Sequence, residues 1–168
     1  MGSETPPTVA TDMLPRLDPV RSVRTDVLEI AYHEAGPSEG ETVLLLHGFP
    51  YDIHTYADVI PQLVAAGRRV IVPYLRGHGP TRFLDGATPR SGQQAALGAD
   101  VIALMDALSI PRAILAGHDW GGRAACIVAA LWPERCHGLV SVNGYLIQDI
   151  AAAMTPISKP ASGTSTTS

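Results

Sequence analysis

Apolar runs that suit buried strands alternate along this chain with segments of helical periodicity, and this alternation constrains its fold most. Four such runs cover residues 42–46, 70–72, 113–116 and 139–142. Between them, apolar residues recur at helical spacing over residues 56–64, 97–108 and 123–132. Strands and helices joined by such short connections predict right-handed βαβ units. With two shorter strands expected at 22–25 and 27–32, the predicted fold class is α/β, with a mostly parallel sheet and flanking helices.

The 168 residues suffice for a single domain with its own core. We expect a flexible leader at residues 1–15, which are rich in Thr and Pro, and the domain itself at 16–150. Residues 151–168 run into Ser, Thr and Pro, a composition that cannot pack a core, so a low-complexity tail is expected there. The sequence offers no further strand after 139–142. We therefore expect an exposed apolar sheet edge, and self-association through it is a candidate partner interaction.

The charge pattern bears on the class of partner. The net charge is −4 and the basic residues are scattered rather than clustered, so neither nucleic acid nor an anionic membrane is expected as a partner. The N-terminus lacks the pattern of a signal peptide, and no apolar stretch reaches membrane-spanning length. These features predict a cytoplasmic protein. In a reducing cytosol, free thiols are expected at Cys126 and Cys136, with a disulfide between them as the alternative. We expect a small-molecule substrate, no cofactor and no metal.

The segment Gly117-His-Asp-Trp-Gly-Gly122 lies between a predicted strand and a predicted helix. A nucleophile elbow needs this context, because a tight strand-to-helix turn raises its central side chain above the sheet edge. The centre here is Asp119, and an ordinary pKa of about 3.9 makes it an anion at neutral pH. It can attack an electrophilic carbon without a base, and a second step must hydrolyse the resulting ester. The alternative is an ordinary turn in which Asp119 caps the helix.

A second motif, His47-Gly-Phe-Pro50, directly follows the strand predicted at 42–46. In a sheet of this topology the turn lies beside the elbow, where its backbone can donate to a developing oxyanion. The donors would be the N–H groups of Phe49 and Trp120. Either motif alone is explained by an ordinary turn after a strand. Their order along the chain, with a full βαβ crossover between them, favours a joint role in catalysis.

Together with Arg76-Gly-His-Gly79, the two motifs resemble those of the soluble epoxide hydrolases and of their haloalkane and haloacetate dehalogenase relatives. The resemblance covers residues 25–150 and implies an α/β-hydrolase core in which Asp119 attacks an epoxide or a halogen-bearing carbon. It also implies that a histidine-activated water cleaves the ester while Phe49 and Trp120 hold the oxyanion. The residues that would support the two motifs are His47, Gly48, Pro50, Gly117, His118 and Gly121.

Two details favour an epoxide as the substrate. Haloalkane dehalogenases typically carry a polar residue where Phe49 stands, and a Phe side chain cannot hold a halide. Haloacetate dehalogenases resemble Asp-Arg-Gly-Gly-Arg at the elbow, whereas this chain has Trp120 in place of the first arginine. It keeps the second, Arg123, which is either a substrate contact or a solvated helix residue. Tyr74 stands where these families usually place Asp, and the sequence offers no functional account of it.

The catalytic partners of Asp119 are not found further along the sequence. In this fold the acid and the histidine follow the nucleophile, yet after Gln148 the chain offers only Asp149 and no histidine. We therefore expect a hydrolase that is truncated before the cap and the C-terminal strands and is incomplete for turnover. Three functions remain open: an epoxide hydrolase-like enzyme, a haloacid or haloalkane dehalogenase, and a catalytically dead chain that acts by binding.

The remaining histidines are not assigned to catalysis. His33, His54 and His137 lie near predicted turns or helix ends, where exposure or local hydrogen bonds are expected. His78 is expected to be structural within its turn, and His118 to pack under the elbow.

Overall fold

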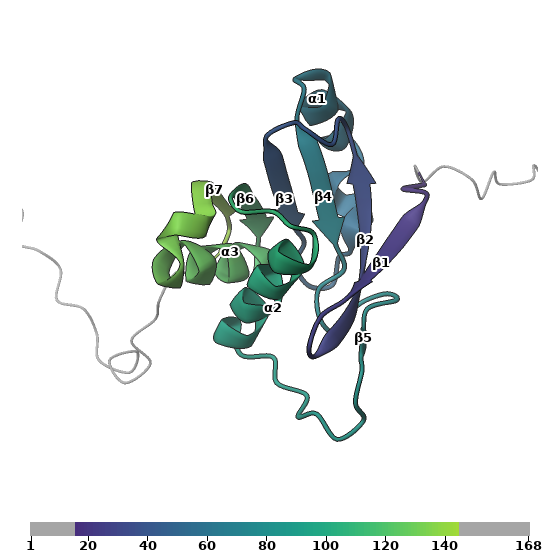
Figure 1. Cartoon of the computed structure of the whole chain (residues 1–168), viewed down its shortest axis with the longest axis vertical. Helices are drawn as coiled ribbons and strands as arrows, with labels where there is room; N and C mark the ends of the chain where they lie inside the picture. Colours follow the sequence, from purple (N-terminus) through teal and green to yellow (C-terminus); the bar gives the residue numbers. More distant parts are fainter. Residues whose placement is uncertain (1–15, 145–168) are drawn as a thin grey trace, which may run out of the picture.

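The computed structural model describes residues 16–144 and shows a seven-stranded sheet with helices on both faces (Figure 1). The strands are β1 (Val20–Arg24), β2 (Leu28–Ala35), β3 (Thr42–Leu46), β4 (Arg69–Pro73), β5 (Arg82–Phe83), β6 (Ala113–His118) and β7 (Cys136–Val142). The helices in this range are α1 (Ile60–Ala65), α2 (Gln94–Ala107), α3 (Trp120–Leu131) and the short 3-10 helices η1 (Ile53–Tyr56) and η2 (Pro133–Arg135). The predicted α/β fold class is confirmed.

The strand order places the two sequence motifs next to each other. The order is β1-β2-β4-β3-β6-β7, with β5 paired to β2. Strands β4, β3, β6 and β7 run parallel, whereas β2 is antiparallel to its neighbours. In the β3–β6 pair, Leu46 lies beside Gly117. The loops that leave the carboxyl ends of these two strands therefore start side by side, at the edge of the sheet where α/β proteins bind ligands.

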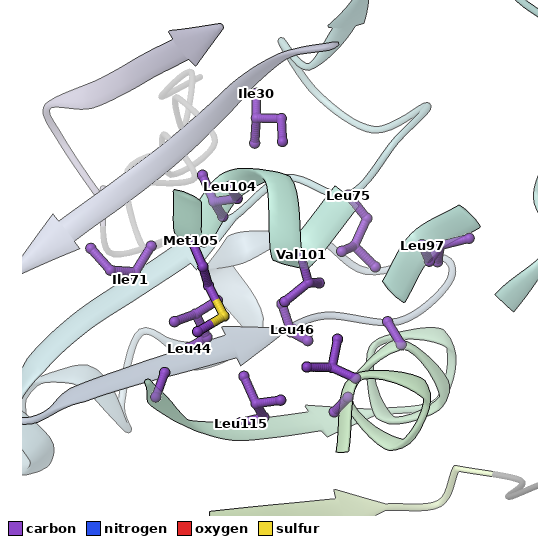
Figure 2. Packing of buried hydrophobic residues seen from close by; sticks show 14 of the residues in the cluster. Ile30, Leu44, Leu46, Ile71, Leu75, Leu97, Val101, Leu104, Met105 and Leu115 are labelled. Carbon is purple, nitrogen blue, oxygen red and sulfur yellow. The ribbon is translucent and has the colours of Figure 1, made fainter. Parts of the chain in front are cut away.

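Strand β3 is buried on both faces of the sheet. Leu44 and Leu46 point to one face, where they pack with Val101 of α2 (Figure 2). Helices α2 and α3 pack against each other on this face. The intervening Val43 and Leu45 point to the other face and belong to the apolar layer that includes residues of η1 and α1. Burial on both faces explains why 42–46 reads as an unbroken apolar run rather than an alternating one.

The helix predicted over 56–64 is divided in the structure into η1 and α1. Pro61 lies in the first turn of α1. Its missing N–H and fixed φ suit the start of a helix but prevent continuation from the preceding turn. Tyr56 and Leu63 pack against the apolar layer as the periodicity predicts. Val59, however, caps α1 and is exposed, so its predicted place on the buried face is wrong.

Strand β7 lies at the edge of the sheet, opposite β1 (Figure 1). The strand predicted at 139–142 is confirmed, but its predicted burial on both faces is wrong. Leu139, Val140 and Val142 are 43%, 52% and 57% exposed. Within residues 16–144, β7 pairs with β6 on one side only, and α3 packs against it. An apolar sheet edge is therefore exposed, as expected.

Some predictions fall outside the described residues. The leader at 1–15, the tail at 151–168 and Asp149 are among them, so the domain boundaries stay predictions. Within residues 16–144, no helix is long and apolar enough to cross a membrane. A cytoplasmic location also stays a prediction. Cys126 and Cys136 both carry free thiols.

Candidate active site

Asp119 occupies the single position between β6 and α3. Its backbone has φ 51° and ψ −119°, a conformation that residues other than glycine adopt only under strain. The turn is tight, because a Cβ on Gly117 would lie 2.5 Å from the carbonyl of Gly121. A Cβ on Gly121 would in turn overlap the carbonyl of Leu46 at the end of β3. Glycine is therefore required on both sides of Asp119 by the approach of neighbouring backbone.

The side chain of Asp119 does not act as a helix cap. Although Asp119 stands at the N-cap position of α3, its carboxylate makes no capping hydrogen bond to that helix. The alternative interpretation of the elbow as a capped turn is therefore not supported by the geometry.

The backbone of the second motif reaches this carboxylate. The N–H of Phe49 donates to Oδ1 of Asp119 over 3.0 Å, and the N–H of Trp120 is near enough to the carboxylate to help lower its pKa. Gly48 permits the approach, because a Cβ there would lie 2.6 Å from the Cβ of Asp119. The Phe49–Pro50 peptide that follows is cis. The structure thus brings both predicted oxyanion donors to the predicted nucleophile.

These donors govern the charge of Asp119. Burial tends to raise the pKa of its carboxyl group, but the N–H groups of Phe49 and Trp120 and the positive charge of Arg123 outweigh it. The net result is a pKa below the ordinary value for Asp. Asp119 is therefore a half-buried anion at neutral pH, and it can attack carbon without a base.

His47 is fully buried at the start of the loop that follows β3, with an exposed fraction of 0%. Its Nδ1 lies 3.1 Å from the carbonyl oxygen of Gly48, and its Nε2 accepts from the N–H of Leu75 over 3.1 Å. Burial is the largest influence on this ring and lowers its pKa from 6.5 to about 4. The ring is therefore neutral at physiological pH and joins the Gly48 loop to the turn after β4.

His118 directly precedes Asp119, and its half-buried ring lies beside η1. Its Nδ1 is 3.3 Å from the hydroxyl of Tyr56, and its ring centroid is 5.7 Å from that of Tyr51. The Tyr56 hydroxyl also donates to the carbonyl of Leu46 over 2.7 Å. Tyr56 therefore links the end of β3 to the elbow. The sequence marked Tyr56 only as one of a periodic apolar set, so this link was missed.

Arg123 lies in the first turn of α3, with its Cζ 4.4 Å from the centroid of the Trp120 ring. The residue is half-buried, so it is neither fully exposed nor part of the core. Stacking on the neighbouring indole keeps the guanidinium near the elbow, where its charge helps to lower the pKa of Asp119. A contact between Arg123 and substrate stays a prediction.

The Arg76-Gly-His-Gly79 turn is anchored to helix α2. Arg76 binds both carboxylate oxygens of Asp100 on α2, through Nε and Nη2, at 2.6 Å each. The ring of Tyr74 lies against Gly79 so closely that a Cβ there would overlap it. This packing gives Tyr74 a structural account. Asp100 was missed, although an acid next to Val101 on the buried side of an apolar helix is a usable signal.

The other histidines lie apart from the elbow. His33 is buried in strand β2 rather than exposed; burial lowers its pKa, and the backbone of Pro19 and Leu17 offsets part of this shift. His54 bonds locally to Asp52 over 3.0 Å, as predicted, and His137 lies 3.1 Å from Glu41. Among residues 16–144 we assign no histidine to Asp119 as a base. No group of three or more His, Cys, Asp and Glu side chains in this range is placed to hold a metal ion.

Comparison with known proteins places this geometry in context. Residues 41–162 match the family described as the alpha/beta hydrolase fold. The chain is 32% identical over 127 residues to Epoxide hydrolase 3 from Siraitia grosvenorii. The aligned region covers 76% of this chain and 40% of the relative.

Comparison with solved structures also finds proteins that carry the name epoxide hydrolase. A Klebsiella pneumoniae protein provisionally named an epoxide hydrolase superposes with a TM-score of 0.79 and 54% identity, over 84% of this chain and 47% of that chain. Epoxide Hydrolase A from Mycobacterium thermoresistibile gives a TM-score of 0.66 and 32% identity, over 73% and 38%. This chain thus spans less than half the length of each of these relatives.

Proposed function

Since this chain belongs to the α/β-hydrolase fold family, we propose that Asp119 is the nucleophile of an epoxide hydrolase-type reaction that passes through an ester of its own carboxylate. The observation that carries the proposal is the 3.0 Å hydrogen bond from the Phe49 N–H to Oδ1 of Asp119. Backbone donors aimed at one oxygen stabilise negative charge on it without taking part in the chemistry. The other oxygen, Oδ2, is the one proposed to react.

In the proposed first step, Oδ2 of Asp119 attacks a ring carbon of an epoxide. The ring C–O bond breaks, its electron pair stays on the former epoxide oxygen, and that oxygen takes a proton from water or from an acid. Oδ1 becomes the carbonyl oxygen of the new ester and keeps its hydrogen bond to Phe49. The step needs only an ionised carboxylate, which the low pKa of Asp119 supplies at neutral pH.

In the proposed second step, water adds to the ester carbon and negative charge develops on Oδ1. The N–H groups of Phe49 and Trp120 stabilise this oxyanion, and its collapse releases a diol and restores the carboxylate. A base must take the proton of the attacking water, and we assign none among residues 16–144. The complete cycle is therefore proposed for a protein of the relatives' length, and ester formation with stalled hydrolysis is proposed for this chain.

An epoxide fits the site better than a halogenated substrate. Phe49, whose side chain is 68% exposed, offers no polar side-chain atom to a leaving halide. The relatives compared above carry the name epoxide hydrolase. A haloacid dehalogenase remains the second candidate because Arg123 holds a positive charge near Asp119, where it could bind a substrate carboxylate. A chain that acts only by binding is the non-enzymatic alternative.

Intact-mass measurement after incubation with a small reactive epoxide and, separately, with a haloacid distinguishes the three functions. Ring opening adds the whole mass of the epoxide, whereas a haloacid adds its mass less that of the hydrogen halide. We expect an epoxide adduct that accumulates on the unmodified chain and is absent in Asp119→Asn. Circular dichroism confirms that each variant is folded.

Asp26→Asn is the matched control, because Asp26 is an exposed carboxylate between β1 and β2, two strands that do not border β6. It should form the adduct at the rate of the unmodified chain. An adduct that forms only with the haloacid and disappears in Arg123→Ala would replace the epoxide with the second candidate. A folded chain without any Asp119-dependent adduct would favour the binding function.

A further inference from the structure

The two hydrogen bonds of His47 fix a single form of its ring. A carbonyl oxygen can only accept, so Nδ1 must carry the proton that it donates to Gly48 over 3.1 Å. The N–H of Leu75 can only donate, so Nε2 must present a lone pair to it over 3.1 Å. Only the neutral ring protonated at Nδ1 satisfies both contacts.

The carbonyl that His47 holds belongs to the peptide unit whose N–H points at the nucleophile. The C=O of Gly48 and the N–H of Phe49 are two ends of one planar group. His47 bonds to the oxygen of this group at 3.1 Å, and Asp119 accepts from its nitrogen at 3.0 Å. Because the plane is rigid, fixing the carbonyl direction fixes the N–H direction. A hydrogen bond at the oxygen also polarises the amide and strengthens the N–H as a donor.

The surroundings leave this peptide and its histidine little freedom. The ring of His47 meets the ring of His78 edge-on with centroids 4.7 Å apart, and that of Tyr74 at 6.4 Å. On the other side, Gly48 approaches Asp119 so closely that even a Cβ has no room. The ring therefore cannot turn to expose its other nitrogen without losing both hydrogen bonds.

We infer that His47 is a positioning residue: through the Gly48 carbonyl it aims and polarises the Phe49 N–H that serves as oxyanion donor to Asp119. The inference deepens the proposed function and rests on it. The buried ring of His47 bonds to Gly48 and Leu75 and not to the carboxylate of Asp119, and it is not exposed to a substrate. It acts on Asp119 through the single peptide unit that joins Gly48 to Phe49.

Two variants separate the two nitrogens of the ring. His47→Asn places an amide N–H₂ near the position of Nδ1 and can keep the bond to Gly48. His47→Gln places an amide oxygen near the position of Nε2 and can keep the bond from Leu75. Both remove one hydrogen bond and similar volume, so a purely structural role predicts similar losses of stability and similar effects on the site.

A positioning role predicts different effects at the site. In His47→Gln the Phe49 amide proton should shift upfield and exchange faster with solvent, and the pKa of Asp119, followed by carboxyl ¹³C NMR, should rise. Alkylation by the reactive epoxide should slow by about tenfold, because a displaced peptide no longer holds Oδ1 and so no longer orients Oδ2 toward the ring carbon. In His47→Asn these quantities should stay near those of the unmodified chain. The control His137→Gln changes an exposed histidine of β7 and should change none of them.

Equal changes of the Phe49 amide in the Asn and Gln variants, in proportion to their loss of stability, would overturn the inference. Should either variant fail to fold, ¹⁵N NMR of the unmodified chain decides the matter, because a ring protonated at Nε2 contradicts the required form. The NMR measurements do not require the chain to react with an epoxide. A chain that is never alkylated but shows the Gln-specific NMR change would refute the proposed function and leave the positioning role of His47 intact.

Discussion

The N–H of Phe49 and Oδ1 of Asp119 lie 3.0 Å apart, although 70 positions separate the two residues in the chain. Their contact depends on the pairing of β3 with β6, which sets Leu46 beside Gly117. The two loops then meet through backbone, with Gly48 in between. Changes that separate these loops should therefore affect ester formation more than they affect the core.

Gly48→Ala should abolish most of the ester formation. A Cβ at this position would lie 2.6 Å from the Cβ of Asp119 and 2.8 Å from its Oδ1, so one of the two loops must move. The moved loop no longer holds Oδ1, so Oδ2 loses its orientation toward the ring carbon. Such a displacement of about 1 Å can cost about 10² in rate, and we expect at least a tenfold slower adduct formation by intact mass. Gly86→Ala is the matched control, because a Cβ there meets nothing within 4 Å. Equal rates for the two variants would contradict the prediction.

Asp119→Gly should be more stable than Asp119→Ala. With φ 51° and ψ −119°, Asp119 adopts a backbone conformation that glycine reaches freely. Relief of this strain, less the greater chain entropy of glycine, should raise the free energy of unfolding of the glycine variant above that of the alanine variant by about 1 kcal/mol. Urea unfolding provides the comparison, since both variants lose the carboxylate and its hydrogen bond from Phe49 and only the glycine variant loses the strain. A glycine variant less stable than the alanine variant would mean that the elbow stores no strain.

Stability should fall as the pH drops from 6.5 to 4. Burial lowers the pKa of His47 from 6.5 to about 4 in the folded chain, so in this window the unfolded chain binds a proton that the folded chain does not. The contribution of His47 is complete above pH 6.5 and decreases by about 3 kcal/mol at pH 4. Urea unfolding at pH 7 and pH 4.5 measures the change.

His33, whose pKa is also lowered by burial, contributes in the same direction. Comparison with His47→Gln isolates the part that belongs to His47, because the variant retains His33. The variant should lose less stability than the unmodified chain over the same pH interval. Identical losses would show that His47 is protonated as readily in the folded chain as in the unfolded chain.

The chain should self-associate through β7 with a second copy of itself. This edge strand carries no charged residue between Gly138 and Val142, and Val140 is 52% exposed. An unpaired apolar edge is a template for another strand, and lysine is a common means of blocking it. Sedimentation velocity should show an apparent mass that rises with concentration, and Val140→Lys should suppress the rise. Val59→Lys, at an exposed valine beside α1, serves as the control and should leave the association unchanged.

Much of the fold could be predicted from the sequence, because local patterns specify it. The apolar run Thr42–Leu46 matches β3 at both ends, since a strand buried on both faces needs apolar residues throughout. The glycines around Asp119 marked the elbow, because only glycine allows backbone to pass so closely. Errors arose where local signals compete, as at Pro61, which divides a helix that the periodicity joins.

The sequence by itself determined the nature of the elements and the chemical character of Asp119, since both depend on residues close together in the chain. The order of the motifs predicted that Phe49 would approach Asp119, but only the tertiary structure decided which carboxylate oxygen its N–H reaches, that His47 holds the Gly48 carbonyl and that Tyr56 links Leu46 to His118. Each of these depends on which strands are neighbours in the sheet. The order of strands follows from the packing of the whole sheet, and no local pattern of side chains encodes it.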